Sequence, residues 1–257
     1  VFTLSFIHLH VHSPFSFLDG ASSLADLVNQ AAAMGQSALA ITDHNSLSSA
    51  VQFHKLALAA GISPIQGAEL TLANGHHLIA LSQNPKGYGN LCKLITSAYN
   101  AGNRFNPGVP QEALIKCCGD LIFLSGCRKG EIPALLLKGE RESAKEIALF
   151  YQDLVGPDNF YLELTHDFLP FTTKLNKALI QLASELDLPV VATNNVHYLH
   201  KEDFPLHDTL TCIRTLTTVT DVHRERRLNA ENYLKSTTEM VKLFAHCPQA
   251  ITATKAI

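Results

Sequence analysis

The chain has 257 residues, of which 46 % are hydrophobic and 17 % are charged, and its net charge is −3 with histidine neutral. This length suits a single α/β barrel of roughly 250 residues, and the slight acidity argues against a broad surface for the phosphate backbone of nucleic acids. The sequence also lacks a run of the ~20 apolar residues that a membrane-spanning helix needs, so we expect no membrane association.

The amino terminus and the cysteines indicate a cytoplasmic protein. No basic region followed by an apolar run opens the chain, so we expect no signal peptide, and because residue 1 is Val we expect the native start to have been trimmed or to lie upstream. None of the six cysteines forms a Cys-x-x-Cys pair, which favours a reducing compartment. They are Cys92, Cys117, Cys118, Cys127, Cys212 and Cys247.

The first predicted element is a short strand over residues 5–12, in which three histidines alternate with apolar residues. Side chains in a strand repeat every two residues, so His8, His10 and His12 share one face. Neighbouring imidazoles repel one another when protonated, whereas neutral imidazoles are strong ligands for zinc and similar metals. We therefore expect a metal ion beside this strand.

Apolar runs typical of buried strands alternate with helical patterns along the rest of the chain. Further strands are predicted over residues 37–42, 62–65, 68–72, 77–81, 120–125, 160–164 and 189–193. Helices are predicted over residues 23–32, 49–60, 88–99, 143–154 and 171–186, a loop over 102–110, and short helices after 201. Ser23 and Asp26 resemble a capping box, Gly35 is a helix stop, and Asn74-Gly75 predicts a hairpin turn.

Strands that alternate with helices predict parallel β-α-β units, and about seven such units indicate a barrel rather than an open sheet. The carboxyl ends of parallel strands share one rim of a barrel, where sites are built. Polar residues fall at or near such ends; they are Asp19, Asp43, His44, Glu69, His76, His77, Cys127, Asn195 and His197. A hydrogen bond, a helix cap or an inert buried thiol explains each one singly, but together with the alternating histidines they predict a metal centre.

Several segments resemble motifs of the PHP (polymerase and histidinol phosphatase) domain. They are FIHLHVHS at 6–13, FLDG at 17–20, TDH at 42–44, GAE at 67–69, HL at 77–78, LSGC at 124–127 and NVH at 195–197. Their order and spacing resemble those of bacterial DNA polymerase III alpha subunits. The error-prone branch is the most similar, through FSFLDGAS at 15–22, GCRKG at 126–130 and ATNNVHY at 192–198. The likeness covers nearly the whole chain, including YLKS at 233–236.

The resemblance implies an α/β fold, a distorted (β/α)7 barrel of PHP type over residues 1–200. A helical extension over 201–257 would lead toward a polymerase palm domain that this chain does not contain. The resemblance also implies up to three divalent metal ions. A mixed set of imidazole, carboxylate and thiolate donors suits zinc, iron or manganese better than magnesium alone.

Nine metal ligands are implied by the resemblance: His10, His12, Asp19, His44, Glu69, His77, Cys127, Asn195 and His197. Five of them are also expected to be catalytic: His10, His12, His44, Glu69 and His197. His8 is expected to be polar lining and Asp43 to orient an imidazole. Only one of His76 and His77 faces the site if their strand is regular.

Adjacent divalent ions lower the pKa of a bound water and clamp a phosphoryl oxygen, so the implied chemistry is phosphoester cleavage. Active members of the family usually have aspartate at the position of Asn195, although the error-prone branch often has asparagine. A neutral amide adds no charge against the ions and bridges poorly. We therefore expect one metal position to be weakened.

Three hypotheses follow. The first is a phosphoesterase, a candidate 3′–5′ exonuclease, within an error-prone DNA polymerase III alpha-like enzyme of DNA replication, repair and translesion synthesis. The second is a metal-bound but catalytically weak scaffold that stabilises the polymerase and binds partners. The third is a free-standing histidinol-phosphatase-like enzyme, against which the polymerase-like tail argues.

The expected partners are DNA, through the full-length polymerase, other polymerase domains, and accessory replication or mutagenesis proteins. The only basic cluster contains His223, Arg224, Arg226 and Arg227. We interpret it as a solvated helix face rather than as a DNA contact, since most charge runs are of that kind.

Overall fold

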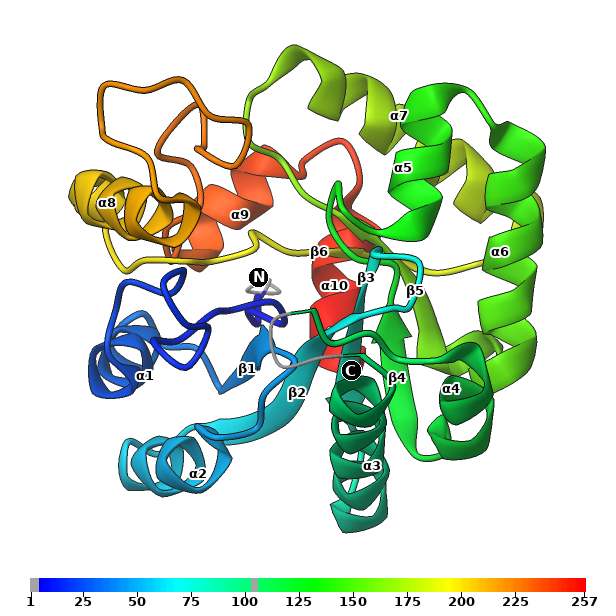
Figure 1. The fold of residues 1–257 in the computed structure, drawn as a ribbon, viewed down its shortest axis with the longest axis horizontal. Coiled ribbons are helices and arrows are strands. Elements are labelled where there is room, and N and C mark those ends of the chain that lie inside the picture. Colours follow the sequence, from blue (N-terminus) through cyan, green and yellow to red (C-terminus); the bar gives the residue numbers. More distant parts are fainter. Residues whose placement is uncertain (1–4, 103–105) are drawn as a thin grey trace.

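The computed structural model describes residues 5–102 and 106–257, which form a curled sheet with helices around it (Figure 1). Within these residues the sheet has six strands in the order β1-β2-β3-β4-β5-β6. The strands are β1 (Ala38–His44), β2 (Ser63–Thr71), β3 (His77–Ser82), β4 (Leu121–Leu124), β5 (Phe160–Leu164) and β6 (Val190–Ala192). Neighbours are parallel except at β3, which is antiparallel to both β2 and β4. The α/β class is thereby confirmed.

Most helices lie around the outside of the sheet, whereas α10 (Pro248–Ala256) lies at the centre of the view (Figure 1). The others are α1 (Leu24–Ala33), α2 (Ala50–Ala59), α3 (Pro85–Ala101), α4 (Gln111–Cys117), α5 (Glu131–Lys138), α6 (Arg141–Val155), α7 (Pro170–Leu186), α8 (Phe204–Thr215) and α9 (Thr237–Leu243). Ser23 caps α1 by accepting the N–H of Asp26 at 3.2 Å, and Gly35 follows with a positive φ of 72°. The local signals read from the sequence therefore do begin and end this helix.

The segment with the alternating histidines is extended but forms no regular strand, so the predicted strand over 5–12 is wrong in that respect. Its main chain fills the gap between β1 and the chain after β6. On one side its carbonyl groups accept the N–H groups of Ala40 and Thr42, at 2.9 and 2.8 Å. On the other side Val11 bridges to Val196 in parallel. This segment takes the place of the expected seventh strand.

The hairpin between β2 and β3 reverses the direction of the sheet. Gly75 has a φ of 83° at this turn, a conformation that glycine adopts without a steric penalty. Because β3 is antiparallel to its neighbours, its amino end, rather than its carboxyl end, lies at the rim with the carboxyl ends of β1 and β2. Thr71 of β2 is paired with His77 of β3. The hairpin predicted at Asn74-Gly75 is therefore confirmed, and it brings His77 to the carboxyl end of β2.

The segment after residue 201 packs on the barrel. Met240 of α9, Phe244 directly after it and Ile251 of α10 are buried in the same cluster as Phe123 and Phe160 of β4 and β5. Burial of one such side chain stabilises the fold by about 1.5–3 kcal/mol. A domain boundary near residue 200 stays a prediction, because the two parts share one core.

Most predicted elements are present with shifted ends. The strands predicted over 62–65 and 68–72 form one strand, β2, and the helix predicted over 88–99 is longer at both ends. Helices α4 and α5 were not predicted. Residues 103–105 of the predicted loop over 102–110 lie outside the described residues.

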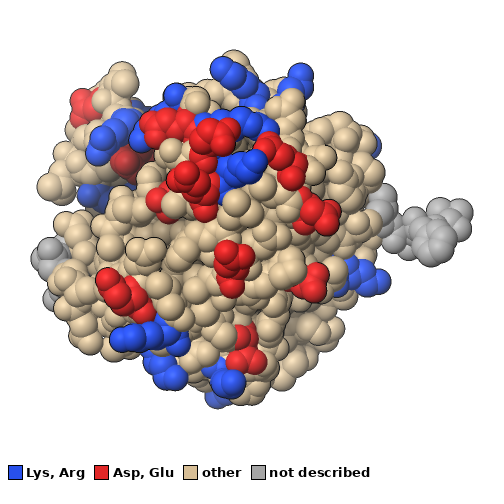
Figure 2. Space-filling model, turned by 90° about the vertical axis from the view of Figure 1, so that its right-hand side faces the viewer, with Lys and Arg blue, Asp and Glu red and all other residues tan. Residues whose placement is uncertain are grey.

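Three findings bear on the expected partners, on the membrane and on the cysteines. On the face in Figure 2, which is the right-hand side of Figure 1, acidic and basic side chains are mixed and form no broad basic band. Among the described helices we find none that combines the length and apolar character of a bilayer span. All six cysteines are free thiols.

Candidate metal centre

The predicted residues meet at one rim of the barrel, in a pocket of about 550 Å³. Eight of the nine predicted ligands line it: His12, Asp19, His44, Glu69, His77, Cys127, Asn195 and His197. The ninth, His10, is fully buried and lies against Glu69. Loops and strand ends from residue 10 to residue 197 thus supply one pocket, as the barrel argument required.

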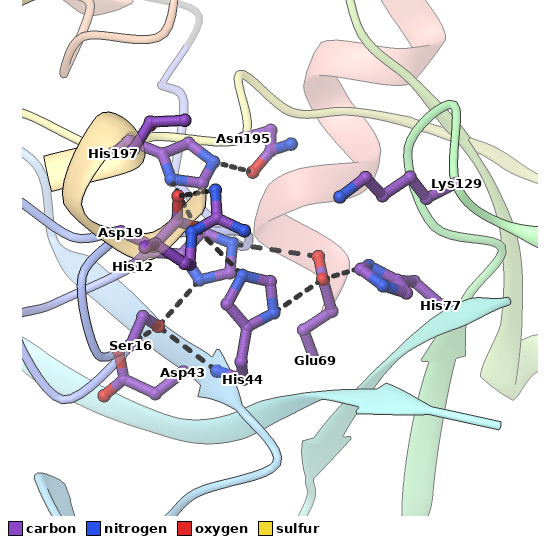
Figure 3. A network of polar contacts seen from close by, with 12 residues as sticks. His12, Ser16, Asp19, Asp43, His44, Glu69, His77, Lys129, Asn195 and His197 are labelled. Atoms are coloured by element: carbon purple, nitrogen blue, oxygen red, sulfur yellow. Dashed lines mark hydrogen bonds and ion pairs between the residues drawn. The ribbon is translucent and has the colours of Figure 1, made fainter. Parts of the chain in front are cut away.

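Glu69, near the end of β2, is the centre of the site (Figure 3). Its Oε2 atom lies 2.8 Å from His10 Nε2 and 3.7 Å from His12 Nε2. Its Oε1 atom lies 2.9 Å from His44 Nδ1 and also contacts His77 Nδ1. One carboxylate therefore touches four imidazoles from three different parts of the chain, since His10 and His12 belong to one segment.

Asp19 forms a second centre on the loop after the histidine segment. Its Oδ2 atom lies 2.9 Å from His44 Nε2 and 3.1 Å from His197 Nδ1. The loop is tightly folded at Gly20, where an added Cβ would lie 1.9 Å from the carbonyl oxygen of Ser13. Only glycine fits there, so Gly20 fixes where Asp19 is presented.

The donor atoms fit divalent metal ions. Four groups of three residues bring possible ligand atoms within 4.8 Å of one another: His10, His12 and Glu69; His12, Asp19 and His44; His44, Glu69 and His77; and Asp19, His197 and His207. Glu69 Oε1 and His77 Nδ1 are buried and make no hydrogen bond with the described residues, although they lie beside each other. Buried polar atoms without partners are rare, and a cation beside them would satisfy both.

Neighbouring carboxylates keep two of the histidines protonated without a metal. Burial lowers the pKa of His10, but Glu163 and Glu69 outweigh it and raise that pKa to about 9. In the same way Glu69 and Asp19 outweigh burial and raise the pKa of His44 to about 10. The two carboxyl groups next to the imidazoles have pKa values well below the usual range despite burial.

The other two central histidines stay neutral. Burial and then repulsion from His197 and His44 hold the pKa of His12 well below its usual value. Burial and the Arg227 guanidinium do the same for His197. A neutral imidazole is the form that binds metal, so the pocket already presents a lone pair at His12.

Two chains of hydrogen bonds determine which ring nitrogen of His10 and of His12 faces the pocket. His10 Nδ1 donates to Glu163 Oε1 at 2.7 Å, which leaves Nε2 toward Glu69. The hydroxyl of Ser16 donates to Asp43 at 2.8 Å, so His12 Nδ1 must donate to Ser16, at 2.9 Å. The Nε2 atom of His12 is then free for a metal. Asp43 acts on an imidazole through Ser16 rather than directly.

Cys127, His76 and His77 differ in how close they come to the grouped ligand atoms. Cys127 lines the pocket but is in none of the four groups of ligand atoms; burial, Glu69 and Glu163 raise its thiol pKa to about 12, so without a metal it is a thiol. His77 belongs to a group, whereas His76 contacts the carbonyl oxygen of Lys129 at 3.2 Å. The structure thus brings His77, not His76, to the site.

Three residues of the site were missed by the sequence interpretation. Glu163 orients His10, His207 of α8 joins Asp19 and His197, and Arg227 contacts His197 Nε2. Glu163 is an acidic residue in an otherwise apolar strand, which was a usable signal. The basic cluster was misread as a helix face: it is a loop, and Arg226 in it pairs with Asp208 at 2.8 Å.

His8 is buried away from the four groups and hydrogen bonds to the carbonyl oxygen of Lys235 at 2.8 Å. Burial lowers its pKa from 6.5 to about 4. Between pH 6.5 and about pH 4, the His8 imidazole is therefore protonated in the unfolded chain and neutral in the folded protein. Stability from this group is present above pH 6.5 and is lost as the pH falls toward 4, about 3 kcal/mol in total.

A His8→Gln variant keeps a donor for Lys235 and removes this titration. Urea unfolding at pH 7.5 and pH 4.5 is expected to show a larger loss of unfolding free energy for the wild type than for the variant. Equal losses in both proteins would contradict the assignment of this pH dependence to His8.

Comparison with known proteins decides the family. A family model described as the PHP domain matches residues 8–167, more than half of the chain. The chain belongs to the PHP domain family. The match includes His10, His12, His44 and Glu69, and ends before His197, which the fold brings back to them.

Curated relatives of this PHP domain are DNA polymerases. It is 48 % identical to an error-prone DNA polymerase of Symbiobacterium thermophilum, over 99 % of this chain and 25 % of that protein. It is 41 % identical to a DNA polymerase III subunit alpha of Treponema pallidum, over 96 % of this chain and 22 % of that protein. The chain thus spans about a quarter of the length of these relatives.

Among solved structures, a putative metal-dependent phosphoesterase from Bifidobacterium adolescentis matches with a TM-score of 0.49 and 15 % identity. The match covers 76 % of this chain and 88 % of that one.

Proposed function

We propose that this PHP domain is part of an error-prone DNA polymerase III alpha-like enzyme and that its pocket is a divalent-metal phosphoesterase site acting on the 3′ ends of DNA. The observation that carries the proposal is Glu69, one buried carboxylate in contact with four imidazoles. Such a set has no evident structural use, because a buried cluster of this charge is costly without an ion.

The predicted ligands that are grouped around Glu69 would hold the ions. Imidazole, carboxylate and thiolate donors together favour zinc, manganese or iron, with magnesium as the weaker alternative. When bound, the ions supply a water of near-neutral pKa and charge that clamps a phosphoryl oxygen. Residues of this chain do the rest: Glu163 and the Ser16–Asp43 pair aim His10 and His12, and Gly20 fixes Asp19.

Basic side chains at the mouth of the pocket suit a phosphate-bearing substrate. Arg128, Lys129 and Arg214 line it, and Arg128 lies 4.3 Å from the centre of the Phe171 ring. Lys129 and Arg214 both face Glu225, at 3.1 and 3.7 Å. A DNA phosphate would compete with Glu225 for this pair.

The second candidate is a metal-bound scaffold of weak activity within the polymerase, with the segment 201–257 leading toward other polymerase domains and accessory proteins. Asn195, a neutral residue at a ligand position, favours it. The free-standing histidinol-phosphatase-like hypothesis is weaker, because the relatives named above are polymerases about four times as long.

His44→Ala is the test variant, since His44 lies between Glu69 and Asp19. The purified protein is incubated with a 3′-labelled primer and Mn²⁺ or Zn²⁺, and separately with a small phosphomonoester. We expect primer trimming by the wild type and a loss of at least about 100-fold in the variant. His54→Ala, at an exposed position of α2, is the matched control and should keep full activity.

Bound metal is measured in the same samples by elemental analysis. Metal without trimming in the wild type would favour the scaffold. Rapid turnover of the phosphomonoester with no trimming would favour the phosphatase. Trimming that survives in His44→Ala would place the activity elsewhere.

A further inference from the structure

Asn195 is held in an unusual place. It is buried, its φ is 43°, and its side-chain oxygen Oδ1 lies 2.9 Å from His197 Nε2. Asparagine is one of the few residues that adopt this left-handed conformation readily. An amide can turn to present its NH2 group to a lone pair, whereas an ionised aspartate can only accept.

Arg227 reaches the same nitrogen atom. Its Nη2 group contacts His197 Nε2, and its Nη1 group donates to Asn232 Oδ1 at 2.9 Å. Asn232 is itself fixed, since its side-chain NH2 group donates to the carbonyl oxygens of Asn194 and Asn195, each at 3.1 Å. The guanidinium is therefore positioned by the fold.

The contact has a chemical consequence for His197. A guanidinium is always charged and only donates, so His197 Nε2 must meet it with its lone pair. A metal ion at this nitrogen would need that same lone pair. His197 Nδ1 faces Asp19 Oδ2 at 3.1 Å, so neither ring nitrogen is left over.

We propose that Arg227 is a built-in cation that occupies the His197–Asn195 corner in place of one divalent ion. The chain then holds about two ions, in the groups that share Glu69. An aspartate at position 195, together with the absence of the arginine, would allow a third ion. This inference rests on the proposed metal site and specifies its composition. The guanidinium still lines the pocket, so it also offers N–H groups to a phosphoryl oxygen.

A two-by-two set of variants tests the proposal: wild type, Asn195→Asp, Arg227→Gln, and both together. Metal per folded chain is measured with Mn²⁺ and Zn²⁺ by elemental analysis and titration calorimetry. We expect about two ions in the wild type and in each single variant. Asn195→Asp alone gives a carboxylate that pairs with Arg227, and Arg227→Gln alone leaves a poor amide ligand. A third ion should appear only in the double variant.

Arg224→Gln, combined with Asn195→Asp, is the matched control. Arg224 is in the same loop, but its side chain is 90 % exposed, so this pair should bind no third ion. Arg227→Met with Asn195→Asp provides a second double variant if the first does not fold, as judged by circular dichroism.

The outcomes separate this inference from the proposed function. A third ion in the wild type or in Asn195→Asp alone overturns the role of Arg227, as does a folded double variant that binds no more than the wild type. In those cases the metal site itself stands. A wild type that binds no ion at all contradicts both proposals.

Discussion

Replacing Glu69 with glutamine is expected to empty the pocket of metal and to abolish phosphoester cleavage. The amide keeps the size of the side chain but removes the one negative charge that four histidines share. Loss of a residue that only supports a ligand costs about 10–100-fold in metal affinity, so loss of this central carboxylate should cost at least about 100-fold. Titration calorimetry with Mn²⁺ and the primer assay measure the two effects.

The control for this variant is Glu185→Gln. Glu185 is an exposed residue of α7 that pairs with Arg141 and Lys145, at 2.8 and 2.6 Å. Exposed pairs contribute about 0–1 kcal/mol, so metal affinity should be unchanged. A metal affinity of Glu69→Gln within about threefold of the wild-type value would contradict the proposed site.

Removing the side chain of Asp43 is expected to give the largest loss of stability among these variants. The buried carboxylate accepts four hydrogen bonds: from Ser13 N–H at 2.8 Å, and from the hydroxyls of Ser13, Ser16 and Ser49 at 2.7, 2.8 and 2.7 Å. Asp43→Ala should lower the free energy of unfolding by at least about 3 kcal/mol, since hydrogen bonds to charged groups contribute ~1.5–3 kcal/mol each.

The same variant should affect His12. Without Asp43 the hydroxyl of Ser16 is free to donate to His12 Nδ1, and the imidazole proton then moves to Nε2, the metal-facing atom. Metal affinity should fall by about 10–100-fold. Urea unfolding and calorimetry measure the two effects, and Asp153→Ala, an exposed aspartate of α6, serves as the control. A destabilised protein with unchanged metal affinity would refute the orienting role but not the structural one.

The local features of the fold were predictable because they depend on short-range patterns. Apolar runs located each strand from β1 to β6, and Gly35 and Asn74-Gly75 marked real turns. The alternation over 5–12 was correct in grouping His10 and His12. It could not show that this segment lacks a regular ladder, because that depends on how the two edges of the sheet come together.

The residues that line the candidate site were predictable, whereas most of the residues that orient them were not. Residue types with metal-binding chemistry at strand ends are visible in a sequence, and the family resemblance ordered them. Ser16 and Arg227 act through contacts with Asp43 and His197, which lie far from them in the sequence, and nothing in their local sequence indicates these partners. Glu163 was marked only by its charge in an apolar strand. The reversal of β3, which brings His77 to the carboxyl end of β2, was indicated by the Asn74-Gly75 turn signal, and its antiparallel pairing with both neighbours confirms it.

The histidine segment has a consequence for how the molecule is made. It is synthesised before its partners, since its main chain hydrogen bonds to β1 and to the chain after β6. The carbonyl oxygen of Asp19, in the next loop, accepts a hydrogen bond from His207, which is 188 positions later. Contacts of such sequence separation form slowly because a long loop must first close. During synthesis, therefore, the histidine segment and the loop of Asp19 obtain their full set of hydrogen bonds only after α8 has been made.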